Sequence, residues 1–304
     1  MARRKSTGKV YLIGAGPGDP GLMTLKGRDL IAQADCVVYD ALVSPSMLAW
    51  IKPGCEKINV GKRAGNHAMP QDKINELLVD CAEKYACTVR LKGGDPYVFG
   101  RGGEEALALH AAGVAFEVVP GVTSAIAGPA CAGIPVTHRD CCTQFTVFTG
   151  HEGTHKTEST LDIPGIAAAK GTKVMLMGMS HLRETMQALV AAGQNADTPA
   201  AAGQWAATGR QKSVTATVAT LAEAVESAGI ASPAVVVIGE VVSLAPMLDW
   251  RSRLPLCGQR VVVTRTREQA SDLSNQLLAL GADVIEFPTI RIADPTDRRD
   301  FAEA

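Results

Sequence analysis

Residues 10–27 read VYLIGAGPGDPGLMTLKG, an apolar run followed by a loop of glycine and proline and then by the start of a helical pattern. Two later segments have a similar form, VGKRAG at residues 60–65 and LKGGDPYVFGRGGEE at residues 91–105. In each of the three, glycines and charged residues come directly after an apolar, strand-like run. Such loops bring backbone and charge close to a small molecule, so we expect a binding site where these strands end.

Strand-like and helical patterns alternate through the first part of the chain. The expected strands cover residues 9–13, 35–39, 88–91 and 116–119. Helices are expected at residues 24–34 and 104–113. A further helix is expected to begin at Pro70, because positions 74, 77, 78, 81 and 85 are apolar and fall on one helical face. This alternation indicates an α/β fold with a parallel sheet, in which binding sites lie at the carboxyl ends of the strands.

A second α/β unit is expected after residues 128–137, which are rich in glycine, alanine and proline, as is typical of a hinge. Its strands are expected near residues 145–148, 173–177, 200–204 and 234–238, with a long polar loop at 150–162. A strand–helix–strand unit is expected at residues 260–264, 269–280 and 283–287. The predicted domains are residues 9–132 and 133–248, followed by a linker at 249–257 and a last segment at 258–304.

The composition excludes several classes of protein. With 46% apolar and 20% charged residues among 304, the chain is expected to be a soluble globular protein of two or three domains. The net charge of -1 gives no electrostatic reason to expect nucleic acid or an anionic membrane as a partner. No membrane-spanning apolar run or signal peptide is evident, and eight cysteines without a CxxC pair indicate reduced thiols. We therefore expect a cytoplasmic protein, and we expect no metal site, because His151 and His155 lack a third ligand.

The loop GAGPGDPG at residues 14–21 has two interpretations. A dinucleotide-binding fingerprint would also have a strand before it, a helix after it and an acidic residue such as Asp40 at the end of the next strand. That fingerprint needs a third glycine where Asp19 stands, and Pro17 and Pro20 remove two amide donors that would hold a pyrophosphate. The loop by itself leaves open both a nicotinamide-dependent dehydrogenase and a protein whose cofactor has no phosphate.

The order and spacing of these blocks over residues 9–248 resemble the uroporphyrinogen-III C-methyltransferases, members of the tetrapyrrole methylase family. The resemblance implies a two-lobed α/β fold with S-adenosyl-L-methionine in a cleft between the lobes, and a homodimer. It implies two successive methyl transfers to carbon atoms of uroporphyrinogen III, which give precorrin-2 by way of precorrin-1, in the branch toward siroheme and cobalamin. The cofactor product would be S-adenosyl-L-homocysteine, and no metal is required.

The resemblance also assigns a cofactor site. Its residues match Pro17, Gly93, Gly94, Asp95, Val98, Thr123, Ser124, Met177 and Ala206, with Pro233 nearby. The glycines would admit the cofactor to the backbone, and Asp95 would accept hydrogen bonds from a polar ligand group. A plain turn would also explain residues 93–96, because glycine, aspartate and proline dominate turns. Where the family often has a polar residue and a glycine, this chain has Trp205 and Ala206.

Substrate recognition is assigned to charged residues. Uroporphyrinogen III carries several carboxylates, and arginine pairs with carboxylates in a bidentate manner. Arg101 and Arg139 match substrate-binding positions of the family, and Arg63 and Glu104 would assist. A solvated surface ion pair is the commoner role of a single arginine. Arg101 lies within a glycine-bounded motif, and this position favours a role in substrate binding. The same argument is weaker for Arg139.

Three residues are candidates for catalysis. The resemblance implies that Asp40 accepts a proton, that Lys62 donates one and that Arg101 assists. A carboxylate can take the proton that a pyrrole carbon loses after it attacks the sulfonium methyl group. Lys62 would need burial or a cationic neighbour such as Arg63 to give up a proton near neutral pH. Because the methyl donor is already activated, we expect positioning to supply most of the rate enhancement.

The last segment has a resemblance of its own. Residues 258–292, GQRVVVTRTREQASDLSNQLLALGADVIEFPTIRI, are similar to the opening of the uroporphyrinogen-III synthases. A segment of about 45 residues cannot bury a complete two-lobed core. We expect the front part of a bifunctional fusion, and we expect no synthase activity from the residues present.

Two further alternatives stay open. A related methylase acting on a later corrin intermediate would share the cofactor loops, although FGRGGEE together with VGKRAG favours the earliest step. A non-catalytic module that hands a tetrapyrrole to a fused synthase would keep the arginines and lose the cofactor loops, which are complete in this chain.

Overall fold

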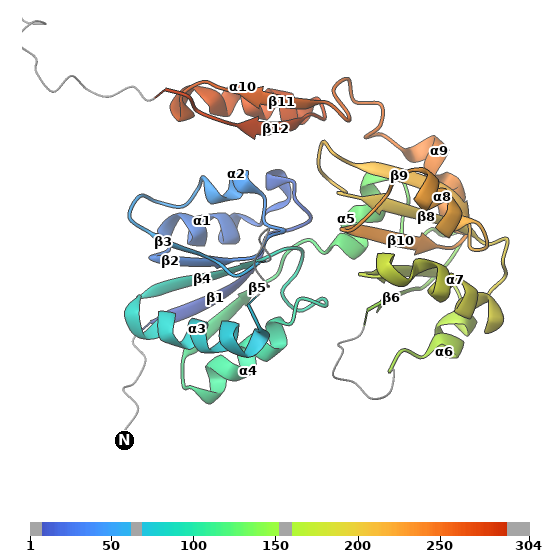
Figure 1. Cartoon of the computed structure of the whole chain (residues 1–304), viewed down its shortest axis with the longest axis horizontal. Helices are drawn as coiled ribbons and strands as arrows, with labels where there is room; N and C mark the ends of the chain where they lie inside the picture. The colour runs from blue at the N-terminus through green and yellow to red at the C-terminus, as the bar shows by residue number, and fades with distance from the viewer. Residues whose placement is uncertain (1–7, 62–68, 152–159, 291–304) are drawn as a thin grey trace, which may run out of the picture.

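The first lobe is built on a parallel sheet, as the alternating pattern predicted, but the sheet has five strands instead of the four expected (Figure 1). The computed structural model describes residues 8–61, 69–151 and 160–290. The strands are β1 (Lys9–Gly14), β2 (Cys36–Tyr39), β3 (Glu56–Asn59), β4 (Cys87–Lys92) and β5 (Ala115–Val119). They lie in the order β3-β2-β4-β1-β5, and every neighbouring pair is parallel. The carboxyl ends of all five strands therefore share one edge, where the glycine-rich loops begin.

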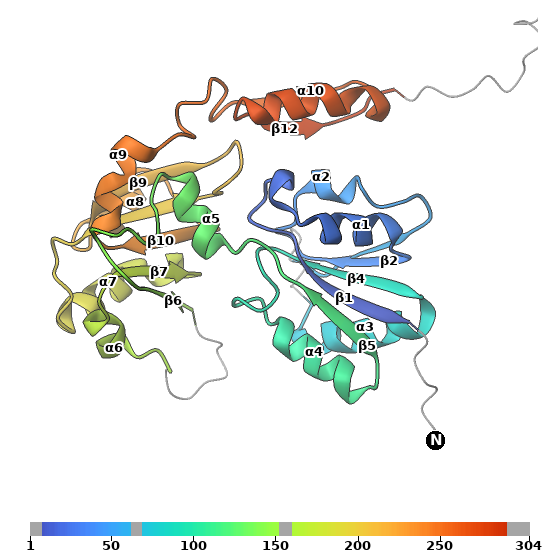
Figure 2. The same cartoon turned by 180° about the vertical axis from the view of Figure 1, so that it is seen from behind.

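Helices cover both faces of this sheet (Figures 1 and 2). They are the 3₁₀ helix η1 (Pro20–Leu22), α1 (Leu25–Gln33), α2 (Pro45–Leu48), α3 (Gln71–Lys84) and α4 (Gly102–Ala111). Local signals explain their bounds: the Thr24 hydroxyl accepts a hydrogen bond from the Gly27 amide at the start of α1. Pro70 stands just before α3 instead of within its first turn, and Gly113 follows α4 with a φ of +70°.

Two apolar layers hold the first lobe together. On one face, α3 and α4 contribute Ile74, Leu78 and Leu109 against Leu12 and Val38 of the sheet. On the other face, α1 and α2 pack against alternate residues of the same strands. Each fully buried aliphatic side chain of this kind stabilises the fold by about 1.5–3 kcal/mol. The sheet is thus buried on both faces, as parallel sheets are.

The second lobe contains a mixed sheet instead of a parallel one. Its strands are β6 (Phe145–Thr149), β7 (Thr172–Leu176), β8 (Pro199–Gln204), β9 (Lys212–Thr217) and β10 (Ala234–Ile238), in the order β6-β7-β10-β8-β9. Strand β10 is antiparallel to both of its neighbours, and β9 is antiparallel to β8. Strand β9 was not predicted, because KSVTAT contains too few large apolar residues to be distinguished from a loop.

Helices also cover both faces of the second sheet. They are α5 (Ser124–Cys131), α6 (Ile163–Ala168), α7 (Leu182–Ala191), α8 (Leu221–Ser227) and α9 (Ala245–Leu248), with 3₁₀ helices η2 (Met179–His181) and η3 (Glu240–Leu244). Helices α6, α7 and α8 pack on one face, and α5, η3 and α9 pack on the other. None of the helices in the described ranges is long and apolar enough to cross a membrane.

The expected hinge at residues 128–137 was wrong in its first part. Gly128 and Pro129 are buried in α5, which packs against β10 and β7 of the second sheet. A Cβ on Gly128 would lie 3.2 Å from a methyl carbon of Val235, so the glycine serves close helix–sheet packing. The chain thus passes from the first lobe to the second between β5 and α5.

The last described segment forms the predicted strand–helix–strand unit. Strands β11 (Arg260–Val263) and β12 (Asp283–Glu286) pair in parallel, and α10 (Arg267–Ala279) connects them. The unit contacts the second lobe through the loop between β8 and β9, where the Gly258 amide donates to the Gly209 carbonyl at 3.1 Å.

Three glycines at the carboxyl edge of the first sheet allow its loops to meet. A Cβ on Gly14 would lie 2.6 Å from the Cα of Gly121 and 2.6 Å from the carbonyl oxygen of Gly94. Gly16 and Gly94 exchange two backbone hydrogen bonds of 3.1 and 2.8 Å. The loops after β1, β4 and β5 are therefore fixed to one another by backbone contact, which only glycine permits at these positions.

We predict that Gly14→Ala lowers the free energy of unfolding by about 1–3 kcal/mol, because the new methyl group meets backbone atoms that cannot move independently. Gly103→Ala is the matched control. A Cβ on Gly103 would meet no atom within 4 Å, so alanine in this helical position should be neutral or stabilising by up to about 1 kcal/mol. Denaturant unfolding of both variants checks the prediction, and equal effects would contradict it.

Candidate functional site

The carboxyl edge of the first sheet brings together most of the predicted cofactor residues. Pro17 lies in the loop after β1, residues 93–98 follow β4, and Thr123 and Ser124 follow β5. The Thr123 hydroxyl accepts a hydrogen bond from the Ala125 amide and so begins α5. Because the three loops contact one another, these residues form one continuous surface.

Asp95 ties two of these loops together. Its Oδ1 accepts a hydrogen bond from the Tyr97 amide at 2.7 Å, and its Oδ2 accepts one from the Gly121 amide at 3.0 Å. Both oxygens are thus engaged with backbone, whereas the sequence suggested a direct bond to a ligand. The carboxylate holds the β4 loop against the β5 loop, and each oxygen keeps a second lone pair for a ligand.

Arg101 stands at the start of α4 in a left-handed conformation with a φ of +57°. Its Nε and Nη2 donate to the two carboxylate oxygens of Glu104 at 2.9 and 2.8 Å. This bidentate bond raises the pKa of Arg101 and lowers the pKa of Glu104. The guanidinium is more than half exposed, and its Nη1 makes no hydrogen bond with any residue that the structure describes. Arg101 is therefore oriented and accessible.

The second lobe presents its predicted residues at one edge of its own sheet. Strands β7 and β8 run in the same direction on either side of β10, so Met177 and Ala206 follow them at the same edge. Met177 is 48% exposed, which excludes the core-filler role that a methionine after a strand usually has. Ala206 is buried, and the Trp205 amide beside it donates to the Pro233 carbonyl at 3.2 Å.

The loop that carries Ala206 links three parts of the molecule. A Cβ on Gly18, in the β1 loop, would lie 2.8 Å from the Thr208 methyl group, so the two lobes meet here. The Arg210 guanidinium lies 3.9 Å from the ring centroid of Trp205, and its Nε lies 3.5 Å from Asp283 of the last segment. This loop joins the first lobe, the second sheet and the unit formed by β11, α10 and β12.

Backbone strain is confined to the loops that carry predicted cofactor residues. Among the described residues, the non-glycine residues with positive φ are Phe99, Arg101, Met177, Trp205 and Ala207. The first two follow β4, Met177 follows β7, and the last two follow β8. Each such conformation costs about 1–3 kcal/mol and persists only where the surroundings impose it. A cluster of this kind is typical of a ligand-binding site, and it can be found only from the structure.

Asp40 lies at the same edge, directly after β2, and is fixed by a buried arginine. The Arg90 Nη2 donates to Asp40 Oδ1 at 2.7 Å, and the Arg90 Nε donates to Glu105 Oε1 at 3.0 Å. Lys92 also donates to Glu105 Oε1, at 2.8 Å. Burial lowers the pKa of Lys92, and the neighbouring Arg90 lowers it further. This network was not predicted, although the alternation in CTVRLK puts Thr88, Arg90 and Lys92 on one face of β4.

The remaining predicted residues are less closely grouped. Arg139 is exposed in the turn between α5 and β6. This turn contacts the amino-terminal end of β7 through Cys142 and Thr172, at the opposite end of that strand from Met177. Val98 and Val136 pack against the same apolar cluster, which brings the β4 loop toward this segment. The predicted site residues Lys62 and Arg63, and also His155, lie outside the described residues.

The loops suit a cofactor without phosphate. Pro17 and Pro20 present no amide donors, and the glycine backbone at residue 94 is open, since a Cβ there would meet nothing closer than 3.9 Å. Exposed apolar side chains at Leu42, Phe99 and Met177 offer surface to an aromatic base. The residues present thus fit S-adenosyl-L-methionine better than a pyrophosphate-containing dinucleotide.

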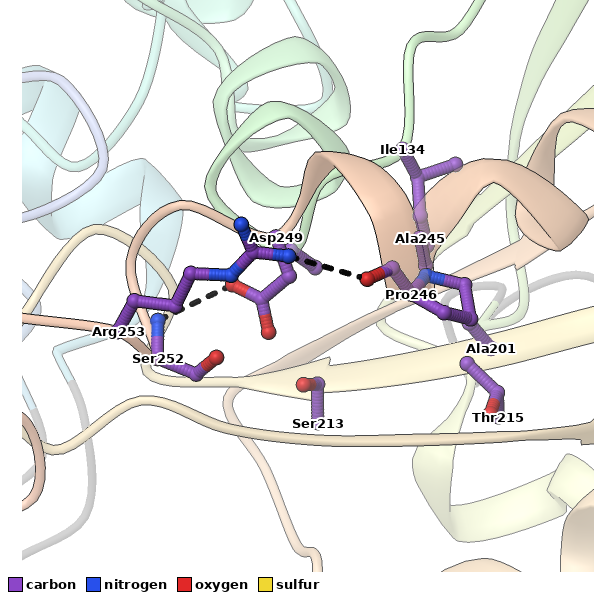
Figure 3. Close-up of a pocket in the computed structure, with 10 residues that line it drawn as sticks. Ile134, Ala201, Ser213, Thr215, Ala245, Pro246, Asp249, Ser252 and Arg253 are labelled. Carbon is purple, nitrogen blue, oxygen red and sulfur yellow. Dashed lines mark hydrogen bonds between the residues drawn. The ribbon is translucent and has the colours of Figure 1, made fainter.

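A cavity of about 350 Å³ lies elsewhere, in the second lobe (Figure 3). It is lined by β8, β9 and α9 and by residues that follow them, including Ser213, Thr215 and Arg253. The Arg253 guanidinium donates to the carbonyls of Pro246 and Met247 at 3.3 and 3.4 Å, which caps α9. None of the predicted site residues lines this cavity, and its charged groups serve the local fold.

The chain is similar in sequence to known proteins. A model of the tetrapyrrole (corrin/porphyrin) methylases matches residues 9–222. A uroporphyrinogen-III C-methyltransferase of Bacillus subtilis (strain 168) is 43% identical over 284 residues, which cover 93% of this chain and 59% of that protein. An S-adenosyl-L-methionine-dependent uroporphyrinogen III methyltransferase of Methanosarcina barkeri is 50% identical over 241 residues, 79% of this chain and 94% of that one.

The chain is also similar to proteins of known structure. The crystal structure of a uroporphyrin-III C-methyl transferase from Thermus thermophilus complexed with S-adenyl homocysteine is 39% identical, with a TM-score of 0.66. The match covers 77% of this chain and 93% of that one. Several curated relatives are much longer, and the chain spans only 52–59% of their length.

We predict that Asp95→Ala lowers the free energy of unfolding by about 1–3 kcal/mol, because two backbone amides lose a charged acceptor. The control is Asp80→Ala, which removes a carboxylate from the solvent side of α3 and should change stability by less than about 0.5 kcal/mol. Denaturant unfolding measures both. If Asp95→Ala behaves like the control, the carboxylate does not hold the two loops together.

Proposed function

The chain belongs to the tetrapyrrole (corrin/porphyrin) methylase family, and we propose that it is a uroporphyrinogen-III C-methyltransferase that uses S-adenosyl-L-methionine. In this proposal two molecules of cofactor methylate two carbon atoms of uroporphyrinogen III in succession. The products are precorrin-1, then precorrin-2, and S-adenosyl-L-homocysteine. We include in the proposal a homodimer, which the sequence resemblance suggests, and two domains whose boundary lies between β5 and α5 instead of at residue 132, because α5 packs on the second sheet.

The observation that carries the proposal is where the strained backbone lies. Among the described residues, positive φ at non-glycine residues occurs only in the loops after β4, β7 and β8. Met177 is one of these residues, and others adjoin Val98 and Ala206; family resemblance assigns these three positions to the cofactor. Relatives with the methyltransferase name are 43–50% identical to the chain, which supports the same cofactor and substrate for it. The donor-poor loop with Pro17 argues against the nicotinamide alternative.

The chain's residues would act mainly by positioning. When bound, the cofactor supplies an activated methyl group on a sulfonium, whose leaving group is neutral. Arg101 would pair with a substrate carboxylate through the guanidinium edge that Glu104 leaves free, and Arg139 would pair with another. Asp40 would take the proton that the methylated pyrrole carbon releases, and Lys62 would supply a proton. Orientation of this kind can account for a large part of a rate enhancement.

For the last segment we propose a synthase-like origin without synthase activity. The parallel pair of β11 and β12 with one covering helix is compatible with the opening of a uroporphyrinogen-III synthase. In the part of this segment that the structure describes, residues 258–290, the sheet has two strands, fewer than an independently stable sheet needs.

We predict that the chain, incubated anaerobically with uroporphyrinogen III and methyl-labelled S-adenosyl-L-methionine, yields a product with two added methyl groups by mass spectrometry. It should bind S-adenosyl-L-homocysteine and should not bind NADH in a fluorescence titration. Tight binding of S-adenosyl-L-homocysteine without methylation would refute the substrate and point to a later corrin intermediate. Binding of NADH alone would refute the cofactor.

We predict that Arg101→Ala raises the KM for uroporphyrinogen III about 10-fold or more, because a charged partner of a substrate carboxylate is lost. The affinity for S-adenosyl-L-homocysteine should stay within about 3-fold, since Arg101 faces the substrate. Arg183→Ala is the control, because Arg183 is an exposed arginine on α7 that pairs with Glu226 at 2.8 Å. Equal kinetics for the two variants would show that Arg101 forms only a surface ion pair.

A further inference from the structure

Asp40 is supported from inside the lobe by a side chain that solvent does not reach. Arg90 is 1% exposed and lies on β4, the central strand of the first sheet. Its Nη2 donates to Asp40 Oδ1 at 2.7 Å, and its Nη1 donates to the Leu91 carbonyl at 3.3 Å. The Asp40 side chain is 28% exposed, and its Oδ2 has no hydrogen-bond partner among the residues that the structure describes. One oxygen is thus held, and the other is available.

Glu105 in turn fixes Arg90. This carboxylate on α4 is fully buried, and its Oε1 accepts hydrogen bonds from Arg90, Lys92 and Gln71 at 3.0, 2.8 and 3.3 Å. With Asp40 included, the buried network contains two cations and two anions, so its formal charges balance. Arginine is suited to this position because its rigid planar fork donates to two carboxylates in fixed directions, whereas lysine is a flexible point charge.

A purely structural role explains the network poorly. Burying an ion pair costs desolvation free energy, and apolar side chains of similar size usually stabilise a core as well or better. Most other side chains of the layer between this sheet and helices α3 and α4 are apolar, among them Leu12, Val38 and Leu109. The ion pairs instead run from Glu105 through Arg90 to the partly exposed carboxylate of Asp40. They therefore fix the direction of the Asp40 carboxylate.

We propose that Arg90 is a positioning residue for methyl transfer: it holds Asp40 so that Oδ2 faces the substrate carbon, and Glu105 holds Arg90. The inference rests on the proposed function, because it gives Asp40 a proton to accept. Arg90 itself does not touch the substrate. The network also explains why two cationic residues, Arg90 and Lys92, lie on the central strand of a buried parallel sheet.

A double-mutant cycle tests this role. We expect Arg90→Met to lower kcat about 10- to 100-fold, while the KM for uroporphyrinogen III and the affinity for S-adenosyl-L-homocysteine stay within about 3-fold. In the Asp40→Asn background the same substitution should lower kcat by less than about 2-fold, because no base is left to position. Arg90→Lys should lose less than Arg90→Met, since it keeps the charge and can still reach one carboxylate.

Two variants keep the test decisive. Lys173→Met removes another buried cation, one that donates to the Ala169 carbonyl at 2.7 Å in the second lobe, and should leave kcat within about 2-fold. If Arg90→Met does not fold, Glu105→Gln replaces it, because it keeps the shape and loses the charge that fixes Arg90; the same dependence on Asp40 is expected. The positioning role of Arg90 would be overturned if Arg90→Met lowered kcat equally in the unmodified chain and in the Asp40→Asn variant, or if it did not lower kcat in the unmodified chain. Either result would leave the proposed function standing. An unmodified chain that methylates nothing would overturn the proposed function as well.

Discussion

At the carboxyl ends of β1, β4 and β5, three loops approach so closely that no side chain fits between them. Gly14, Gly94 and Gly121 meet there, and the Asp95 carboxylate closes the junction by accepting a hydrogen bond from the Gly121 amide. The parts of the first lobe that are predicted to bind the cofactor are arranged around this junction: the proline-containing loop after β1, the backbone of residues 93–98 and the start of α5. Because the junction is made of backbone, its geometry does not depend on side-chain rotamers, which suits a surface that must hold a small molecule in one orientation.

The charged residues between the middle of β4 and the first turn of α4 form two groups with different environments. Arg101 and Glu104 are exposed at the rim, where water screens them and where they can exchange partners with an anionic substrate. Arg90, Lys92 and Glu105 are buried behind the same edge, where no exchange of partners can occur. The exposed pair suits recognition, and the buried group suits rigid support of Asp40. The two groups belong to one short stretch of chain, from the middle of β4 to the first turn of α4.

The sequence predicted the first lobe well because its signals are local. Apolar runs that end in glycine identify β1 and β4, and Thr24 and Gly113 mark helix ends through capping. Strand β9 was missed because KSVTAT has no apolar period, and α5 is hard to recognise because glycine and proline within a buried helix look like a flexible segment. The resemblance to a known family assigned cofactor roles to Met177 and Ala206, which no local pattern distinguishes. The Arg90 network depends on which face of β4 meets α4, and that becomes visible only in three dimensions.

We propose that the loops after β1, β4, β5, β7 and β8 form one cofactor site between the two lobes. A crystal structure of the chain with S-adenosyl-L-homocysteine would test this proposal. We expect electron density for the ligand against Gly93 and Gly94 on one side and Met177 and Ala206 on the other, with the sulfur toward Asp40. Density in the cavity beside Arg253, or contact with only one of the two lobes, would contradict it.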